Sequence, residues 1–468
     1  MRDSIRRRPA ASVGARRRPS APGGVRRLPA ASVGSRRRPS APGGARRLPA
    51  ASDGIHRPPK KMNEVFSLFK YTSSSTSPTL RLVNILYRHG DRSPSTTFPT
   101  DEHKEDSWPQ GWGWLSKVGI EQHFNLGKFL RKRYNGFLNS TYLRNEIKVE
   151  SSSTDRCLMS AQANLAGLYP PSEEQLWNKN IRWIPIPVLT RSKNEDNMLS
   201  FSRSCSKYSQ LYAQNLKNHE LKPEEVKNKE FYDFIYKMTK LRPEGLRKIW
   251  TVADVLFCEK THNYTLPNWV NDTVFERLQK IRAYSFSLMF ETEELAKFKG
   301  GPLLKEMISN MNAKKLGTIN TKLFMYSGHD TTLAALMHSL KVFNNLSPPY
   351  TACLIMELHQ KTDGEYFIRL LYKNSTTNLN NYMKEPHLLT IPGCTTNCPY
   401  TKFLELTQNS VPVDWARECQ LNESKPTSDK TNSETQDPSK FLSVDSGHCM
   451  RQTTQPVAAP TPTCSCRC

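Results

Sequence analysis

The stretch Thr79-Leu-Arg-Leu-Val-Asn-Ile-Leu-Tyr87, followed at once by Arg88-His-Gly-Asp-Arg-Ser-Pro94, decides the fold. Its first part is apolar, is rich in residues that favour strands and follows Pro78, which predicts a buried strand. Its second part carries two arginines around a histidine. In an open α/β sheet the carboxyl ends of the strands face the ligand crevice. Because each guanidinium can bind phosphate oxygens bidentately, the stretch predicts an anion-binding loop at that edge.

Two further strand ends carry residues of the same kinds. A strand is predicted at Lys322–Tyr326, and His329 and Asp330 follow it, just before a helix. Arg156 lies in the first turn of a helix predicted over Asp155–Leu168, which also follows a short strand. Since these junctions should meet at one sheet edge, the sequence predicts that their side chains converge.

The remaining elements complete an α/β pattern. Residues about 192–300 are rich in Lys and Glu with helical periodicity, which predicts a mainly helical insertion. The other expected elements are a helix at Ser116–Tyr134, a strand at Ile147–Val149, a helix at Thr331–Leu340, and a hairpin formed by Ala352–His359 and Glu365–Tyr372.

Both ends of the chain differ in composition from its middle. Residues 1–61 are a ten-residue repeat of Arg, Pro, Ala and Gly that cannot bury an apolar face, so we expect disorder. Residues 1–60 hold sixteen basic and two acidic side chains, more than half of the net charge of +24. This segment is a polybasic arm for nucleic acid or anionic lipid, or, as we favour, a low-complexity extension or a misassigned start.

A linker at 62–77 and a disordered tail at 423–468 are expected to flank one folded domain at 78–422. The charge of that core is ordinary, so it is not expected to bind nucleic acid. The chain has no apolar run of eighteen residues, and no membrane-spanning segment is expected.

The sequence gives two opposing indications of the compartment. Eleven cysteines and several N-x-S/T sequons favour an oxidising, secretory route, yet no signal peptide is visible at the N-terminus. We expect glycans at Asn139, Asn263 and Asn374. Further sequons start at Asn271, Asn345 and Asn422, and Pro348 close behind Asn345 disfavours use of that one.

Several motifs together resemble one known family. Arg88–Pro94 contains R-H-G-x-R-x-P in full, and Ser327–Thr332 contains a downstream His-Asp motif. With these motifs the chain resembles the histidine acid phosphatases of the vertebrate prostatic and lysosomal type, over roughly residues 78–422. Further matching stretches are Trp108–Gly111, Leu158–Ala161, Ile184–Val188 and Cys258-Glu259. The resemblance implies the histidine phosphatase fold, with a mixed open sheet flanked by helices and a helical cap at about 192–300.

The resemblance also implies an activity and roles for six residues. The enzyme would hydrolyse phosphate monoesters at acidic pH, with His89 as the nucleophile that forms a phosphohistidine and Asp330 as the proton donor. The expected phosphate-binding residues are Arg88, Arg92, Arg156 and His329. Fixed cations can stabilise the charge that develops in phosphoryl transfer, so neither a metal nor a cofactor is expected. The family further implies a secreted or lysosomal glycoprotein that forms a homodimer.

Disulfide pairing follows from the resemblance alone, because six cysteines allow fifteen pairings. The implied bridges are Cys205–Cys419, Cys258–Cys353 and Cys394–Cys398.

One segment departs from the family pattern. Where the family reads R-S-T-D-x-D-R-T, this chain has Glu150-Ser-Ser-Ser-Thr-Asp-Arg-Cys157. The pocket arginine is kept as Arg156, but the charge of Glu150 would oppose anion binding by repulsion. Two alternatives therefore stay open. One is a phosphate-binding or polybasic interaction protein with decayed catalysis, and the other is a specialised phosphatase for inositol phosphates or lysophosphatidate.

Overall fold

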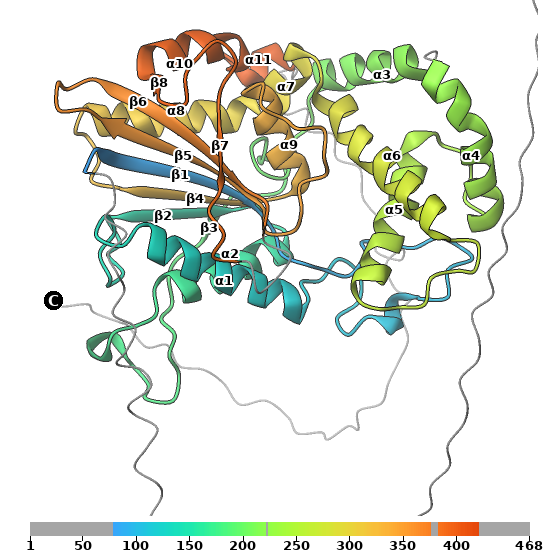
Figure 1. Ribbon diagram of the computed structural model, residues 1–468, viewed down its shortest axis with the longest axis horizontal. Coiled ribbons are helices and arrows are strands. Elements are labelled where there is room, and N and C mark those ends of the chain that lie inside the picture. Colours follow the sequence, from blue (N-terminus) through green and yellow to red (C-terminus); the bar gives the residue numbers. More distant parts are fainter. Residues whose placement is uncertain (1–77, 221–222, 376–381, 421–468) are drawn as a thin grey trace, which may run out of the picture. The chain divides into compact units, whose positions relative to one another are not determined.

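A mixed β-sheet runs through the protein and is covered by helices on both faces (Figure 1). The computed structural model describes residues 78–220, 223–375 and 382–420. The strand order is β3-β2-β4-β1-β5-β6-β7, and β8 pairs with β6. The repeat at 1–61, the linker up to residue 77 and the tail at 423–468 lie outside the described residues.

The sheet has a parallel part and an antiparallel part. The parallel strands are β1 (Leu80–Arg88), β2 (Ile147–Ser151), β3 (Leu189–Thr190) and β4 (Leu323–Gly328). The others are β5 (Cys353–Gln360), β6 (Tyr366–Lys373), β7 (His387–Leu389) and β8 (Cys398–Pro399). In the parallel part Arg88 pairs with Gly328, and Ser151 pairs with Ser327, so three strands end at one level.

Alternating side chains of β1 serve two cores, as the period of a strand requires. Val83, Ile85 and Tyr87 pack toward α1 (Lys117–Arg133) and α2 (Asp155–Leu168). Leu82 and Leu86 pack on the opposite face, which three helices line: α8 (Gly301–Lys315), α9 (Asp330–Ser339) and α10 (Tyr400–Thr407). The short α7 (Glu293–Lys299) packs beside α9. The short α11 (Trp415–Glu418) ends the described chain. Buried on both faces, β1 forms the centre of the domain.

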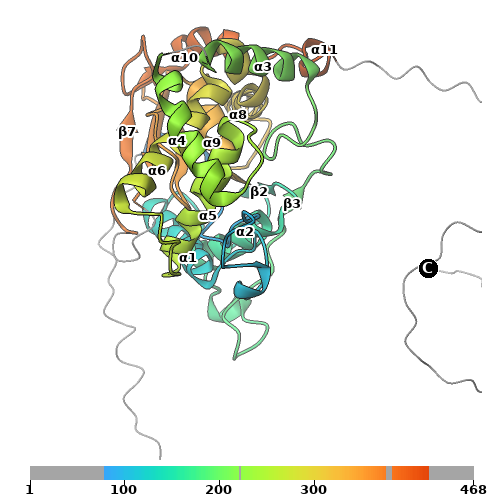
Figure 2. The same ribbon diagram turned by 90° about the vertical axis from the view of Figure 1, so that its right-hand side faces the viewer.

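Four helices form a cap beside the sheet (Figure 1), and Figure 2 looks onto this cap. They are α3 (Ser206–Glu220), α4 (Pro223–Thr239), α5 (Leu246–Thr261) and α6 (Asp272–Phe290). The cap has its own apolar core, in which Ile235, Ile249 and Leu278 are fully buried. Phe98, from the β1–α1 connection, joins that core and so links the cap to the chain after β1.

The predicted elements are found with shifts of one or two residues at their ends, and the mixed sheet flanked by helices is confirmed. Six further elements were not predicted from the sequence: α8, α10, α11, β3, β7 and β8. Turns of 3₁₀ helix, which were also not predicted, occur at Glu105–Ser107, Glu173–Gln175 and Gln408–Ser410.

One of the three implied disulfides is absent. Cys205–Cys419 and Cys394–Cys398 are bridged, whereas Cys258 and Cys353 are buried free thiols. Cys353 packs in the core between the sheet and α1 and α2. The Cys258 sulfur lies instead in α5, 3.4 Å from the Tyr350 hydroxyl. The expectation for Cys258–Cys353 was therefore wrong for this structure, because the two thiols have different surroundings.

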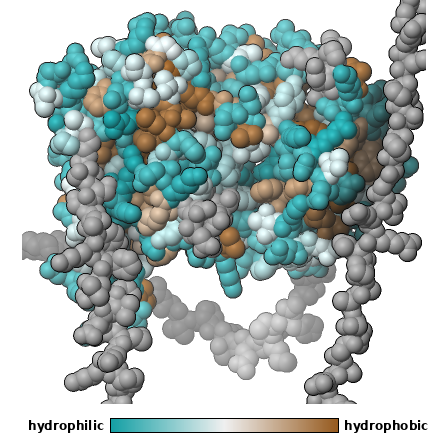
Figure 3. Space-filling view, in the orientation of Figure 1, coloured by the Kyte–Doolittle hydropathy of each residue, from teal (hydrophilic) through white to brown (hydrophobic). Residues whose placement is uncertain are grey.

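One face of the molecule is mainly polar. On the face shown in Figure 3, hydrophilic residues predominate and apolar ones form several separate patches. Within the described ranges no helix is both long and apolar enough to cross a membrane.

Candidate active site

The loop after β1 is fixed by close backbone packing. His89 N donates to Gly328 O at 3.0 Å, and Thr351 N donates to His89 O at 3.1 Å. A Cβ on Gly90 would lie 2.4 Å from the carbonyl oxygen of Gly119 in α1, which no side chain can tolerate. Glycine is therefore required here, and the loop lies directly against the first turn of α1.

His89 is buried and surrounded by cations. Its Nδ1 lies 2.8 Å from Gly90 O, so Nδ1 carries the proton and Nε2 carries the lone pair. Burial, then the charges of Arg156, Arg88 and Arg92, hold the pKa of His89 well below 6.5. The imidazole thus stays neutral in acid, which is the form that can attack an electrophile.

Arg88 lies under the loop and is held from three sides. Its Nη2 is 2.9 Å from Asp330 Oδ2, its Nη1 donates to Pro348 O at 2.6 Å, and its guanidinium lies 4.1 Å from the centre of the Tyr350 ring. A side chain with so many fixed contacts presents its charge with little freedom to reorient.

Arg92 is held by the cap. Its Nη2 donates to both carboxylate oxygens of Asp254 in α5, at 3.2 and 2.9 Å, and its Nη1 lies 3.7 Å from Cys258 Sγ. Burial alone would raise the pKa of Asp254, but the charges of Arg92 and Arg282 lower it. Asp254 is therefore an anion that orients Arg92.

The other strand ends complete the cluster. His329 is the N-cap residue of α9, and its Nε2 lies 3.0 Å from Ser152 Oγ and 3.7 Å from Cys157 Sγ. Burial and Arg156 lower the pKa of His329 to about 3. For Asp330, burial raises the pKa, but the arginines, Arg88 foremost, lower it to about 2. At these pKa values His329 is neutral and Asp330 is ionised in mild acid.

Arg156 supplies the third guanidinium. Its Nη1 lies 3.4 Å from Gly113 O, and its buried Nε has no hydrogen-bond partner among the described residues. Burial and the charge of Arg92 lower its pKa below its ordinary value. A buried cation beside another cation is unfavourable unless an anion joins them, so this arrangement favours anion binding.

The structure gives Glu150 an ion pair. Its carboxylate is buried in β2 and lies 2.6 Å from Arg191 Nε. Arg191 therefore neutralises the charge that the sequence analysis expected to repel an anion.

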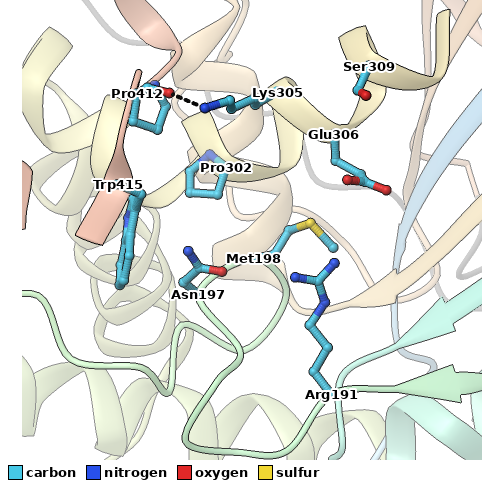
Figure 4. Close-up of a pocket in the computed structure, with 9 residues that line it drawn as sticks. All are labelled: Arg191, Asn197, Met198, Pro302, Lys305, Glu306, Ser309, Pro412 and Trp415. Carbon is cyan, nitrogen blue, oxygen red and sulfur yellow. Dashed lines mark hydrogen bonds between the residues drawn. The ribbon is translucent and has the colours of Figure 1, made fainter. Parts of the chain in front are cut away.

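Arg191 also lines a hollow of about 290 Å³ that contains none of the six predicted site residues (Figure 4). Lys305 on its wall donates to Pro412 O at 2.9 Å. The other lining residues are Asn197, Met198, Pro302, Glu306, Ser309, Pro412 and Trp415.

All six predicted residues come together at the carboxyl edge of the parallel strands. Asp254, Tyr350 and Ser152, which contact them, were missed by the sequence analysis. Asp254 and Tyr350 belong to distant segments and carry no local motif. Ser152 follows β2 and precedes Arg156 by four residues, so its place at a strand end was a usable signal.

Comparison with known proteins points to one family. The profile described as "Histidine phosphatase superfamily (branch 2)" matches residues 79–373. Prostatic acid phosphatase of Bos taurus is 41% identical over 358 residues, which cover 75% of this chain and 91% of the relative. Lysosomal acid phosphatase of Homo sapiens is 43% identical over 347 residues, which cover 73% of this chain and 81% of the relative.

Solved structures share the fold at lower identity. The apo phytase of Hafnia alvei has a TM-score of 0.56 and 19% identity, covering 74% of this chain and 100% of that one. The phytase of Citrobacter braakii has a TM-score of 0.55 and 18% identity, covering 73% and 100%.

Proposed function

Because the chain belongs to branch 2 of the histidine phosphatase superfamily, we propose that it is an acid phosphatase that hydrolyses phosphate monoesters through a phosphohistidine on His89. One observation carries the proposal. A neutral imidazole with its lone pair on Nε2 lies among the charges of Arg88, Arg92 and Arg156. This is a nucleophile surrounded by the groups that bind its electrophile.

The reaction proceeds in two displacements. His89 Nε2 attacks phosphorus, the bond from phosphorus to the ester oxygen breaks, and Asp330 gives its proton to the departing alkoxide. Water then attacks the phosphohistidine and gives a proton to Asp330, and the P–N bond breaks to release phosphate. The arginines and His329 hold the phosphoryl oxygens, on which charge builds up in both transition states.

An acidic pH optimum follows from the protonation states of His89 and Asp330. His89 stays neutral in acid, because burial and the arginines keep its pKa low. Asp330 must be protonated to act, yet the arginine charges lower its pKa to about 2. A bound phosphate dianion offsets the arginine charges and raises that pKa, so that protonated Asp330 becomes available in mild acid.

The guanidinium groups supply the positive charge for this chemistry, so we propose that no metal takes part. Incubation with EDTA is expected to leave the rate unchanged.

The pairing of Glu150 with Arg191 supports activity over the alternative of decayed catalysis, because it removes the expected repulsion. The polybasic alternative depends on residues outside the described part of the chain. A preference for inositol phosphates or lysophosphatidate would depend on how the site recognises the leaving group. The assay below therefore includes both substrates.

We propose a secreted or lysosomal glycoprotein that forms a homodimer. The Cys205–Cys419 and Cys394–Cys398 bridges support an oxidising compartment. Asn139 and Asn263 are exposed, as glycan acceptors must be, and Asn374 is half-buried. Glycan mapping of the secreted protein tests these sites, and light scattering tests the dimer.

The decisive assay is p-nitrophenyl phosphate hydrolysis from pH 3 to pH 8, with His89→Ala as the control. Turnover that peaks in acid and disappears in the variant is expected, and rapid quenching should trap ³²P on His89. Inositol hexakisphosphate and lysophosphatidate are run in parallel to rank substrates. Turnover that His89→Ala retains would overturn the proposal.

A further inference from the structure

The motif residue Asp91 does not face the catalytic cluster, although its two neighbours do. Its side chain is completely buried. Its Oδ2 accepts hydrogen bonds from Ser116 Oγ at 2.5 Å and from His262 Nε2 at 2.7 Å. Its main-chain N–H donates to Gln122 Oε1 at 2.9 Å, and its carbonyl accepts from Ser116 N at 3.0 Å. Asp91 thus joins the loop after β1 to α1 and to the cap.

His262 belongs to a line of side chains along one face of α5. Asp254, Cys258 and His262 are four residues apart, so they lie one above another on the helix. The first two contact Arg92, and His262, the C-cap residue of α5, contacts Asp91. The helix therefore touches two consecutive residues of the loop, one at each end of this line.

The position of the His262 imidazole is fixed by its own packing and backbone contacts. Its ring packs edge-on against Trp108, with the ring centres 5.2 Å apart. The backbone N–H of His262 closes the last turn of α5 by donating to Cys258 O at 3.0 Å. A ring held in this way can hold Asp91 in turn.

We propose that His262 is a positioning residue for phosphate binding, acting through Asp91 to fix where the Arg92 guanidinium lies. The proposal rests on the function proposed above, in which Arg92 binds the phosphoryl group. Asp91 and Arg92 are neighbours, so a shift of the Asp91 backbone moves the origin of the Arg92 side chain. The Arg92 guanidinium is then displaced from the Asp254 carboxylate that orients it.

The test compares His262→Phe, which keeps a ring and loses the donor, with His262→Gln, whose amide can still donate to Asp91. In His262→Phe, kcat/KM for p-nitrophenyl phosphate should fall by about 10- to 100-fold, since small misplacements of binding groups cost that much. The inhibition constant of inorganic phosphate should rise, because Arg92 also binds the ground state. His262→Gln should restore most of both values.

His103→Phe is the matched control. His103 also joins the β1–α1 connection to the chain after α5, through Thr265 O at 2.9 Å and the Tyr264 ring, and these contacts lie outside Arg88–Pro94. It should lower the melting temperature without changing the kinetic constants. If both Phe variants have the same kinetic constants, or if His262→Gln restores nothing, the proposal is wrong.

Two further experiments cover a variant that does not fold and separate phosphate binding from turnover. If His262→Phe does not fold, His262→Ala is measured with and without added imidazole, which should restore phosphate affinity; failure to restore it would overturn the proposal. Titration calorimetry with inorganic phosphate measures binding without turnover. A wild type that binds phosphate more tightly than His262→Phe, yet hydrolyses nothing, would refute the proposed function and leave the role of His262 intact.

Discussion

The sheet edge and the cap helix α5 contribute to the same site in different ways. Residues at the ends of β1, β2 and β4 provide the groups expected to touch phosphate, such as His89, Arg156 and His329. Residues of α5 provide groups that touch those groups, because Asp254 holds Arg92 and His262 holds Asp91. We therefore propose that the sheet edge carries the chemistry and that the cap aligns it. Substitutions in the two regions should differ in size and in kind.

The largest effect is expected for Asp330→Asn at the sheet edge. Loss of the proton donor should lower kcat by about 10²- to 10⁴-fold for an alkyl phosphate such as glycerol 2-phosphate. The loss should be much smaller for p-nitrophenyl phosphate, whose leaving group departs with little protonation. Steady-state kinetics on both substrates measure this difference. Equal losses would contradict the role of Asp330 as proton donor.

A smaller effect is expected for Asp254→Asn in α5. The variant removes the charge that orients Arg92, and kcat/KM should fall by roughly 10-fold, as for a weakened buried charge pair. Asp272→Asn is the control, because Asp272 is an exposed cap carboxylate that pairs only weakly with Lys260 at 3.5 Å. Kinetics of Asp254→Asn that match this control would show that the cap does not align the site.

A smaller effect still is expected for Arg191→Ala. The Glu150 carboxylate would lose the cation that offsets it, and phosphate inhibition should weaken about two- to five-fold through long-range repulsion. Adding Glu150→Gln should restore the inhibition constant. Arg182→Ala, which breaks an exposed pair with Glu173, serves as the control and should change nothing. If Arg191→Ala also leaves phosphate binding unchanged, the paired charge has no bearing on the site.

The smallest effect on activity, and a clear one on stability, is expected for Glu259→Gln in α5. Burial and the nearby Asp101 raise the pKa of Glu259 to about 9. Protonated Glu259 is thus favoured by folding, and its contribution is lost as pH rises from about 4.5 to about 9. The wild-type stability should fall by up to ~1.4 kcal/mol per pH unit in that range.

Thermal melts between pH 4.5 and pH 9 measure this slope. Glu259→Gln mimics the protonated acid, so its melting temperature should fall less with rising pH, and its kcat/KM should stay unchanged. Parallel melting curves for the variant and the wild type would contradict the raised pKa.

Local sequence patterns predict the residues at the sheet edge better than they predict the contacts made by the cap. Arg88, His89 and His329 follow apolar strands directly, so their positions could be predicted from short stretches of chain. The partners Asp254 and His262 lie more than 160 residues after the loop they contact, and no local pattern reports such a contact. The four-residue spacing from Asp254 to His262 is visible in the sequence. The residues that this line contacts, Asp91 and Arg92, cannot be identified from that spacing.

Short elements were missed for a different reason. β3 and β8 have two residues each, too few for an alternating pattern, and their pairing is decided by neighbouring strands. α8 carried a usable signal, because Leu303, Met307 and Met311 recur every four residues on its buried side. The Cys258–Cys353 disulfide was expected from the family resemblance alone, and in this structure both residues are free thiols.

The Cys205–Cys419 bridge joins the start of the cap to the end of the described chain, across 214 residues. The four cap helices and the His329-Asp330 pair lie inside this covalent loop, whereas His89 and Arg156 lie outside it. A protease that cuts anywhere inside the loop therefore releases no fragment, and the two halves of the catalytic cluster stay joined. Nicked protein would migrate as one band until a reductant is added.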